Sequence, residues 1–117
     1  MSSDDATQWQ DDPGFEVTVE NSGGADERAV IALNGELDSL AASQLAQHLE
    51  RVDSRAPGLI LDMQGVSFID SSGLRTLIQA RQMFPDDPAA LTLRKPQAST
   101  TRLLELTGLS DYFALDG

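Results

Sequence analysis

Residues 58–74 read GLILDMQGVSFIDSSGL and place two different hydrophobic patterns next to each other. The first part, Gly58–Met63, is a short apolar run of the kind found in buried strands. From Leu74 onward, apolar residues recur at the three- and four-residue spacing of a helix. The sequence therefore predicts a buried strand, a turn at Gln64-Gly65, and a helix that begins near Ser71 and runs to about Phe84.

The polar residues at the start of this helix place a serine where negative charge is well tolerated. Asp70 or Ser71 can cap the helix by accepting a hydrogen bond from a free backbone N–H. The Ser71 hydroxyl then lies at the positive end of the helix dipole, which favours an anion such as phosphate. Gly73 costs up to about 1 kcal/mol relative to alanine, which suggests a close backbone approach to a partner or a phosphate. A plain helix N-cap accounts for the same residues, and the local sequence leaves both interpretations open.

The rest of the chain alternates short apolar strands with helical patterns, after an opening pair of strands. We expect strands at residues 15–20, 29–33, 59–63, 90–93 and 112–115, and helices at residues 40–52, 71–84 and from about 96 to 108. Gly108 is expected to end the last helix in a left-handed conformation, with Leu109 packing behind it. This order predicts an α/β fold, a mixed and mostly parallel β-sheet packed against α-helices, with an opening β-hairpin.

Two of the helices have apolar stripes that indicate which side chains face the core. In the first helix we expect the inward residues to be Ala41, Ala42, Leu45, Ala46, Leu49 and Val52. The polar residues of that helix are expected to lie elsewhere: Gln44, Gln47, His48 and Arg51. In the last helix we expect the inward residues to be Leu103, Leu104 and Leu106.

Composition limits the class of protein. The chain has 117 residues, enough for one domain, and we expect a disordered acidic arm at residues 1–14 followed by a domain at residues 15–117. The formal net charge of −11, from 19 acidic and 8 basic residues, disfavours nucleic acid and direct membrane binding, which both depend on clustered Lys and Arg. No apolar run is long enough to span a bilayer and the first residues do not resemble a signal peptide, so we expect a cytoplasmic protein.

The sequence offers little for catalysis or for a cofactor. His48 is the only histidine, there is no cysteine, and the serines of residues 70–73 lack the Gly-x-Ser-x-Gly spacing of a nucleophile elbow. Neither of the glycine-rich phosphate-binding motifs is present. The carboxylates, such as Asp86-Asp87, have no recognisable metal-ligand spacing. We therefore expect no enzyme, no cofactor and no metal site.

Three blocks of the sequence, taken in order, resemble the STAS domain, and in particular the bacterial anti-anti-sigma factors (anti-sigma factor antagonists). Gly35–Asp38 resembles the family's Gly-Glu-Leu-Asp, which lies between the second strand and the first helix. Leu59–Leu74 resembles its strand followed by Phe-x-Asp-Ser-Ser-Gly-Leu. Leu103-Leu104 with Thr107–Leu109 resembles its third helix and closing glycine. The resemblance covers the chain from about Phe15 to the C-terminus and implies the STAS fold.

The resemblance implies a partner switch. In the family, the unphosphorylated antagonist binds an anti-sigma factor, a serine kinase with an ATP-binding kinase fold, and so releases a sigma factor for transcription. The kinase phosphorylates the first serine of the pair, which matches Ser71, and a phosphatase restores it. The matching contact residues lie before the first helix and at the start of the second: Glu36, Leu37, Asp38, Ser39, Asp70, Ser71, Ser72, Gly73, Leu74 and Arg75.

An alternative from the same family is a STAS scaffold or accessory subunit of a stress-signalling complex or a membrane transporter. Such proteins share the fold, so the fold alone does not separate them from antagonists. The paired serine favours the antagonist. For Asp38, the sequence leaves partner contact and a helix N-cap equally open.

Overall fold

The computed structural model describes residues 14–117, and the arm predicted at residues 1–14 lies outside these residues except for Gly14. Within them, one sheet of five strands has the order β1-β2-β3-β4-β5. The elements are β1 (Phe15–Asn21), β2 (Ala29–Leu37), α2 (Ser39–Leu49), β3 (Leu59–Ile69), α3 (Ser71–Gln82), the 3₁₀ turn η1 (Pro88–Ala90), β4 (Leu91–Arg94), α4 (Ala98–Thr107) and β5 (Ala114–Asp116).

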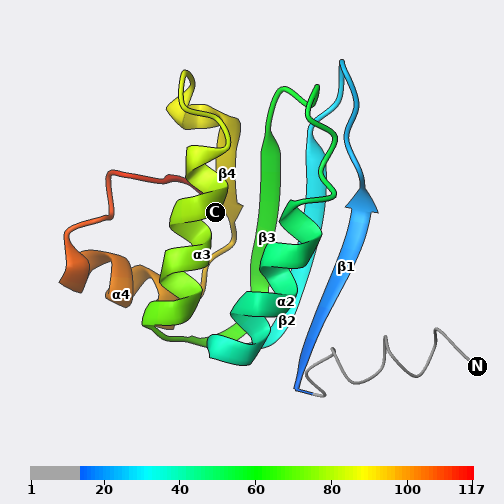
Figure 1. The fold of residues 1–117 in the computed structure, drawn as a ribbon. Helices are drawn as coiled ribbons and strands as arrows, with labels where there is room; N and C mark the ends of the chain where they lie inside the picture. The colour runs from blue at the N-terminus through cyan, green and yellow to red at the C-terminus, as the bar shows by residue number, and fades with distance from the viewer. Residues whose placement is uncertain (1–13) are drawn as a thin grey trace, which may run out of the picture.

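The sheet has the mixed topology that the order of elements predicts. β1 pairs with β2 in antiparallel fashion, and β2, β3, β4 and β5 are all parallel to their neighbours. Helices α2 and α3 lie side by side on one face of the sheet, and α4 lies beyond α3 on the side of β4 (Figure 1). The predicted α/β fold, with a mostly parallel sheet and an opening hairpin, is confirmed.

Alternation along the central strands builds the core between the sheet and the helices. In the middle of the sheet Leu61 pairs with Ile31 on one side and with Leu93 on the other, and all three are at most 1% exposed. Leu45 and Leu77 cover them from α2 and α3 and are fully buried. Burying a side chain of this size stabilises a fold by about 1.5–3 kcal/mol, so this layer holds the two helices against the sheet.

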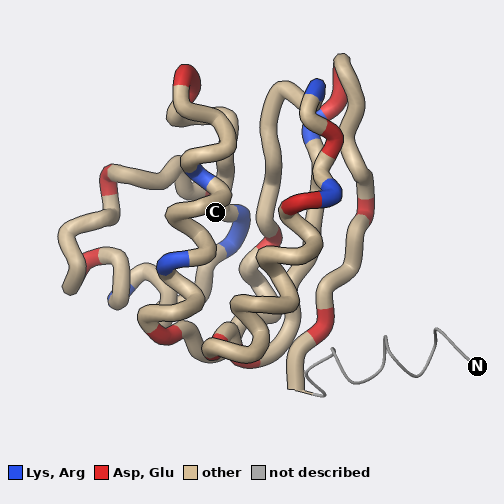
Figure 2. Tube along the Cα trace, viewed as in Figure 1, with Lys and Arg blue, Asp and Glu red and all other residues tan. Residues whose placement is uncertain are grey.

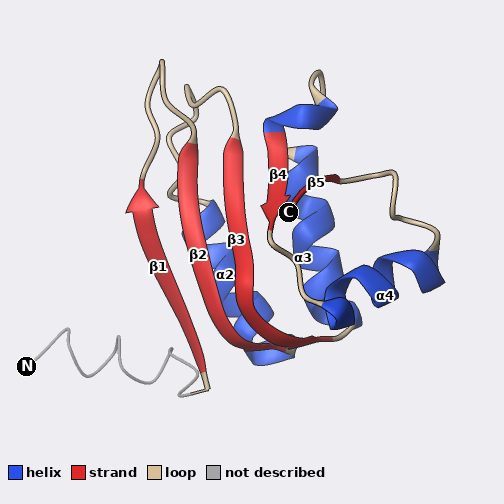
Figure 3. Ribbon diagram, turned by 180° about the vertical axis from the view of Figure 1, so that it is seen from behind, coloured by secondary structure: helices blue, strands red, loops and turns tan. Residues whose placement is uncertain are grey.

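The opposite face of the sheet carries charged and half-buried side chains, and no described helix crosses it (Figure 3). Arg94 on β4 lies 2.9 Å from a carboxylate oxygen of Asp62 on β3 and 3.6 Å from one of Glu20 on β1. Burial alone would raise the pKa of Asp62, but the backbone N–H of Gln64 and the Arg94 guanidinium outweigh it, so this pKa lies below its usual value. The ion pair thus links two neighbouring strands on the open face.

Two strands run further than the sequence predicts. The turn expected at Gln64-Gly65 is wrong, because β3 continues to Ile69, and β2 continues to Leu37 instead of ending near residue 33. Gly65 permits this: a Cβ there would lie 2.8 Å from the carbonyl oxygen of Leu33. A glycine that signals a turn in the sequence instead lets two neighbouring strands come close at a register shift.

Three smaller expectations also need correction. Leu106 is 78% exposed, because α4 turns Thr100 and Leu104 toward the core instead. Gln44 is buried on α2, which ends at Leu49 and not at Val52. In contrast, Gly108 ends α4 with a φ of 74°, and the N–H of Leu109 donates to the carbonyl oxygen of Leu104 at 2.8 Å, which confirms the predicted cap.

Candidate functional site

The two blocks of predicted site residues meet at one edge of the sheet. Leu37 at the end of β2 pairs with Ile69 at the end of β3, and the strands are parallel. Helices α2 and α3 therefore begin side by side, directly after Asp38 and Asp70. Figure 2 shows acidic residues at this edge, where the two helices start.

Both α2 and α3 begin with an aspartate cap. Asp38 has an extended backbone, and its Oδ1 accepts a hydrogen bond of 3.0 Å from the N–H of Ala41. Asp70 also has an extended backbone, and its Oδ1 accepts from the N–H groups of Ser72 at 2.9 Å and Gly73 at 3.1 Å. Of the two caps that the sequence leaves open for α3, Asp70 and Ser71, the structure has Asp70. For Asp38 the structure gives the helix N-cap role, and whether Asp38 also contacts a partner stays a prediction.

Ser71 is the first residue of α3 and is exposed. Among the described residues, its hydroxyl makes no hydrogen bond, because Asp70 supplies the cap from the preceding position. Ser72 is half-buried, and its carbonyl oxygen accepts a hydrogen bond from the Thr76 hydroxyl at 3.2 Å. Of the two serines, Ser71 therefore presents the more accessible hydroxyl.

Contacts within the domain leave no room for a side chain at Gly73. A Cβ at Gly73 would lie 2.5 Å from the carbonyl oxygen of Leu37, 2.8 Å from Leu37 Cγ and 2.9 Å from Ile69 Cγ1. The packing within the domain accounts for this glycine, and the approach of a partner or a phosphate to it stays a prediction. Gly73 lets the first turn of α3 pack on the ends of β2 and β3.

The predicted contact residues divide by exposure. Four have exposed side chains: Glu36, Ser39, Ser71 and Arg75. Three are partly buried: Asp38, Asp70 and Ser72. The remaining three, Leu37, Gly73 and Leu74, are buried in the domain, so they shape the site from beneath and offer no side chain to a partner.

Two large apolar side chains at the same edge are exposed and were not among the predicted site residues. Leu40 on α2 is 56% exposed and Phe68 on β3 is 46% exposed. The sequence gives a weak signal for Leu40, which lies outside the apolar stripe expected for its helix. For Phe68 there is no such signal, because a phenylalanine near a buried strand is most simply read as core.

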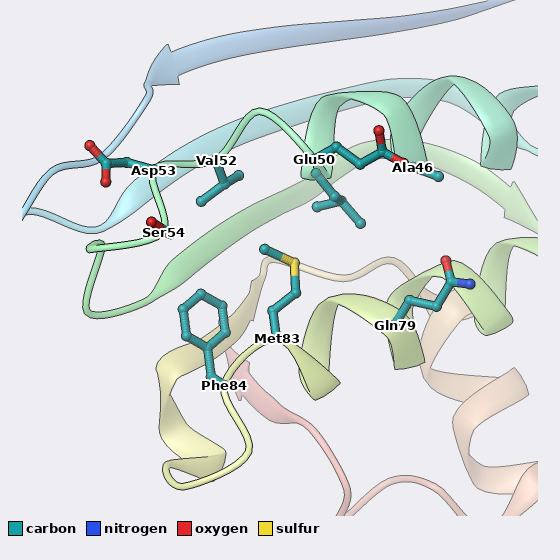
Figure 4. A pocket seen from close by; sticks show the side chains of 9 residues that line it. Ala46, Glu50, Val52, Asp53, Ser54, Gln79, Met83 and Phe84 are labelled. Atoms are coloured by element: carbon teal, nitrogen blue, oxygen red, sulfur yellow. The ribbon is translucent and has the colours of Figure 1, made fainter.

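Two hollows lie between α2 and α3. A shallow groove of about 350 Å³ runs beside the start of α3 and is lined by Ser39, Ala42, Ser43, Ala46, Ser72, Arg75, Thr76 and Gln79. A larger one of about 550 Å³ lies toward the far ends of the two helices, where Met83 and Phe84 point toward Val52 (Figure 4). Its rim carries Asp53, whose hydrogen bonds from the Arg55 side chain and backbone lower its pKa to about 2.

The only histidine of the chain lies far along α2 from the edge where Ser71 begins α3. His48 lies nine positions beyond Ser39 on α2, which is about 13 Å along a helix axis. Its Nδ1 is 3.0 Å from the carbonyl oxygen of Gln44 on the same helix. Within residues 14–117, no group of three or more His, Cys, Asp or Glu side chains is placed to hold a metal ion. In the same part of the chain, no helix is long and apolar enough to cross a membrane.

Comparisons with known proteins agree with the fold described above. Residues 16–116 match the family model described as the STAS domain. The fold is similar to the crystal structure of an anti-sigma factor antagonist from Mycobacterium paratuberculosis, with a TM-score of 0.74, 26% sequence identity, and 90% of this chain and 88% of that chain covered.

Two further solved structures share the fold at lower identity. The unphosphorylated anti-sigma factor antagonist SpoIIAA gives a TM-score of 0.63 at 20% identity, with 88% of each chain covered. The phosphorylated form of the Bacillus cell fate determinant SpoIIAA gives 0.63 at 21% identity, with 88% of this chain and 91% of that chain covered.

Proposed function

Because this chain belongs to the STAS domain family, we propose that it is an anti-sigma factor antagonist that binds an anti-sigma factor while Ser71 is unphosphorylated. This binding releases a sigma factor for transcription, and phosphorylation of Ser71 ends the binding to the anti-sigma factor. The similarity to an anti-sigma factor antagonist across 90% of the chain supports this choice within the family. The proposed protein is a regulator and a kinase substrate rather than an enzyme, and it acts in the cytoplasm without a cofactor.

The observation that carries the proposal is the state of the Ser71 hydroxyl. It is exposed at the first position of α3 and has no hydrogen-bond partner in the described residues. A kinase can therefore reach it without unfolding the helix. The partner in this role is an anti-sigma factor with an ATP-binding kinase fold, and a phosphatase that acts on phosphorylated Ser71 reverses the step.

The contact surface in this proposal is the edge where α2 and α3 begin. The exposed side chains at this edge are those of Ser71, Glu36, Ser39 and Arg75, and the partly buried carboxylates of Asp38 and Asp70 begin the two helices there. A phosphate on Ser71 adds a charge of about −1.5 to −2 next to Asp70. A partner surface that fits a hydroxyl would have to bury this anion without a counter-ion, at a cost of several kcal/mol.

The test is to mix the purified protein with ATP and, one at a time, each kinase-type anti-sigma factor from the same organism. We expect one of them to bind the protein and to add a single phosphoryl group, visible in the intact mass, and we expect Ser71→Ala to bind but not to gain mass. A protein that neither binds any of these factors nor gains a phosphoryl group would contradict the proposal. Such a result favours the alternative, a STAS scaffold or accessory subunit.

A further inference from the structure

Two exposed apolar side chains lie next to the helix caps in sequence, one in α2 and one at the end of β3. Leu40 follows the α2 cap, Asp38, by two residues, and Phe68 precedes the α3 cap, Asp70, by two residues. They are 56% and 46% exposed, whereas their neighbours Leu37 and Ile69 are at most 6% exposed. Both side chains thus lie at the edge where the helices begin, but outside the core.

Phe68 is turned outward by an irregularity in the pairing of β2 with β3. Gly35 pairs with Val66, but the next residue, Glu36, pairs with Phe68, so Ser67 has no partner on β2. An extra residue of this kind reverses the alternation of side chains along a strand. In regular alternation Phe68 would share the buried face of Val66, and here Ile69 is buried instead. Bulges re-aim side chains in this way next to functional sites.

The charges around the two apolar side chains are mostly negative. Glu36 is opposite Phe68 in the sheet, Asp38 and Asp70 begin the two helices, and Arg75 is the one basic residue among the predicted contacts. A second copy of this acidic chain, or an anionic membrane, would meet repulsion at this edge. The surface therefore fits a different protein that presents an apolar pocket bordered by basic side chains.

We propose that Leu40 and Phe68 are the apolar anchors with which this chain binds its anti-sigma factor, an inference that rests on the proposed function. A few residues packed in pockets at the centre of an interface carry most of the binding energy, while near-neutral contacts around them exclude water. Aromatic and aliphatic side chains can fill such pockets as anchors. Phe68 is three residues before Ser71. A phosphate on Ser71 would therefore enter the part of the interface that must lose its water, which explains how one modification can end binding.

The experiment compares dissociation constants for the anti-sigma factor that binds the wild-type protein, measured by calorimetry. We expect Leu40→Ala and Phe68→Ala each to weaken binding by about tenfold or more. Two matched controls remove apolar side chains elsewhere that are about as exposed or more exposed. Leu106→Ala alters a helix leucine that is 78% exposed, and Val19→Ala alters a strand residue that is 45% exposed. We expect both controls to bind within about twofold of wild type, the size of effect usual outside the anchors.

Thermal melting of every variant separates binding from folding. If Phe68→Ala melts much earlier than wild type, Phe68→Leu keeps an apolar side chain in the strand and should still weaken binding. Wild-type affinity in Leu40→Ala and in the folded Phe68 variant would overturn the proposal while leaving the proposed function intact. The absence of any anti-sigma factor that binds the wild-type protein would instead overturn the proposed function and this inference with it. Self-association of the wild type that both variants abolish would assign the surface to a second copy and overturn the proposal.

Discussion

The backbone N–H of Asp70 donates a hydrogen bond to the carbonyl oxygen of Leu37, with a nitrogen–oxygen distance of 3.3 Å. This bond joins the last residue of β2 to the cap of α3, and Leu37 is itself followed by the cap of α2. The starts of the two helices are therefore fixed relative to each other by the backbone. A partner that contacts the first residues of both helices binds a surface that is already ordered, which lowers the entropic cost of binding.

A substitution at Gly73 tests how tightly the start of α3 packs on the ends of β2 and β3. Glycine to alanine in a helix normally stabilises it by about 1 kcal/mol. Here the new Cβ would lie 2.5 Å from the Leu37 carbonyl oxygen, the acceptor of the Asp70 bond. Overpacking of this kind costs about 1–3 kcal/mol, so we expect Gly73→Ala to lower the free energy of unfolding, measured by urea denaturation. Gly24→Ala is the control, because apart from its two chain neighbours no residue has an atom within 4 Å of the added Cβ. Equal stabilities of the two variants would contradict this account of the packing at Gly73.

Substitutions at Asp38 test whether this helix cap also contacts the partner. Asp38→Ala removes the acceptor for the Ala41 N–H and should lower the free energy of unfolding by about 1 kcal/mol. Asp38→Asn keeps a side-chain oxygen that caps equally well but removes the charge. We expect Asp38→Asn to retain the wild-type melting temperature and to bind the anti-sigma factor more weakly. If it binds as tightly as wild type, Asp38 is a cap and nothing more.

The sequence predicts the order of the elements and the start of α3 because both depend on local patterns. The apolar run before Asp70, the helical spacing after it and the left-handed Gly108 are each encoded within a few residues. The Asp70 cap follows from the same short range. These features survive in the structure because tertiary contacts reinforce them.

The features that the sequence does not predict are set by pairing across the sheet. Gln64-Gly65 has the composition of a turn, but its register opposite Asn34 keeps it in β3. The outward position of Phe68 depends on the unpaired Ser67, and the need for Gly73 depends on Leu37, which is 36 residues away in sequence. A local sequence pattern does not contain contacts between residues so far apart in the chain. For this reason the close packing of Gly73 on Leu37 could be interpreted from the sequence as a site for a ligand.

The ion pair on the open face of the sheet should make stability depend on pH. The pKa of Asp62 is lower in the folded protein than its ordinary value of about 3.9. The carboxylate therefore stabilises the fold above that value, and the stabilisation is lost as the pH falls through the lowered pKa. We expect Asp62→Asn to reduce the free energy of unfolding by about 0.2–1 kcal/mol at pH 7, as for other partly exposed pairs, and to make no difference in acid. A double-mutant cycle with Arg94→Gln isolates the pair, and a coupling energy that does not change with pH would contradict the assignment.

The two adjacent serines should behave differently toward a kinase. Ser71 is exposed with a free hydroxyl, whereas Ser72 is half-buried and its N–H is bound by Asp70. We expect phosphopeptide mapping to find the phosphoryl group on Ser71 alone. Ser72→Ala should be phosphorylated normally and Ser71→Ala not at all. Full phosphorylation of Ser71→Ala at Ser72 would show that the switch residue is wrongly assigned.

Phosphorylation of Ser71 should block binding without changing the fold. The phosphate would stand at the N-terminus of α3, which stabilises an anion by about 0.3–1 kcal/mol. Arg75 is four residues further along the same helix, where opposite charges attract by about 0.2–0.5 kcal/mol. These contributions offset the repulsion from Asp70, so we expect backbone amide shifts confined to residues 36–39 and 70–75, together with a large loss of affinity. In Arg75→Ala the phosphorylated form should melt slightly earlier than the phosphorylated wild type, while the unphosphorylated forms match. Widespread amide shifts, or a phosphorylated protein that still binds tightly, would mean that the switch acts through a change of structure or not at all.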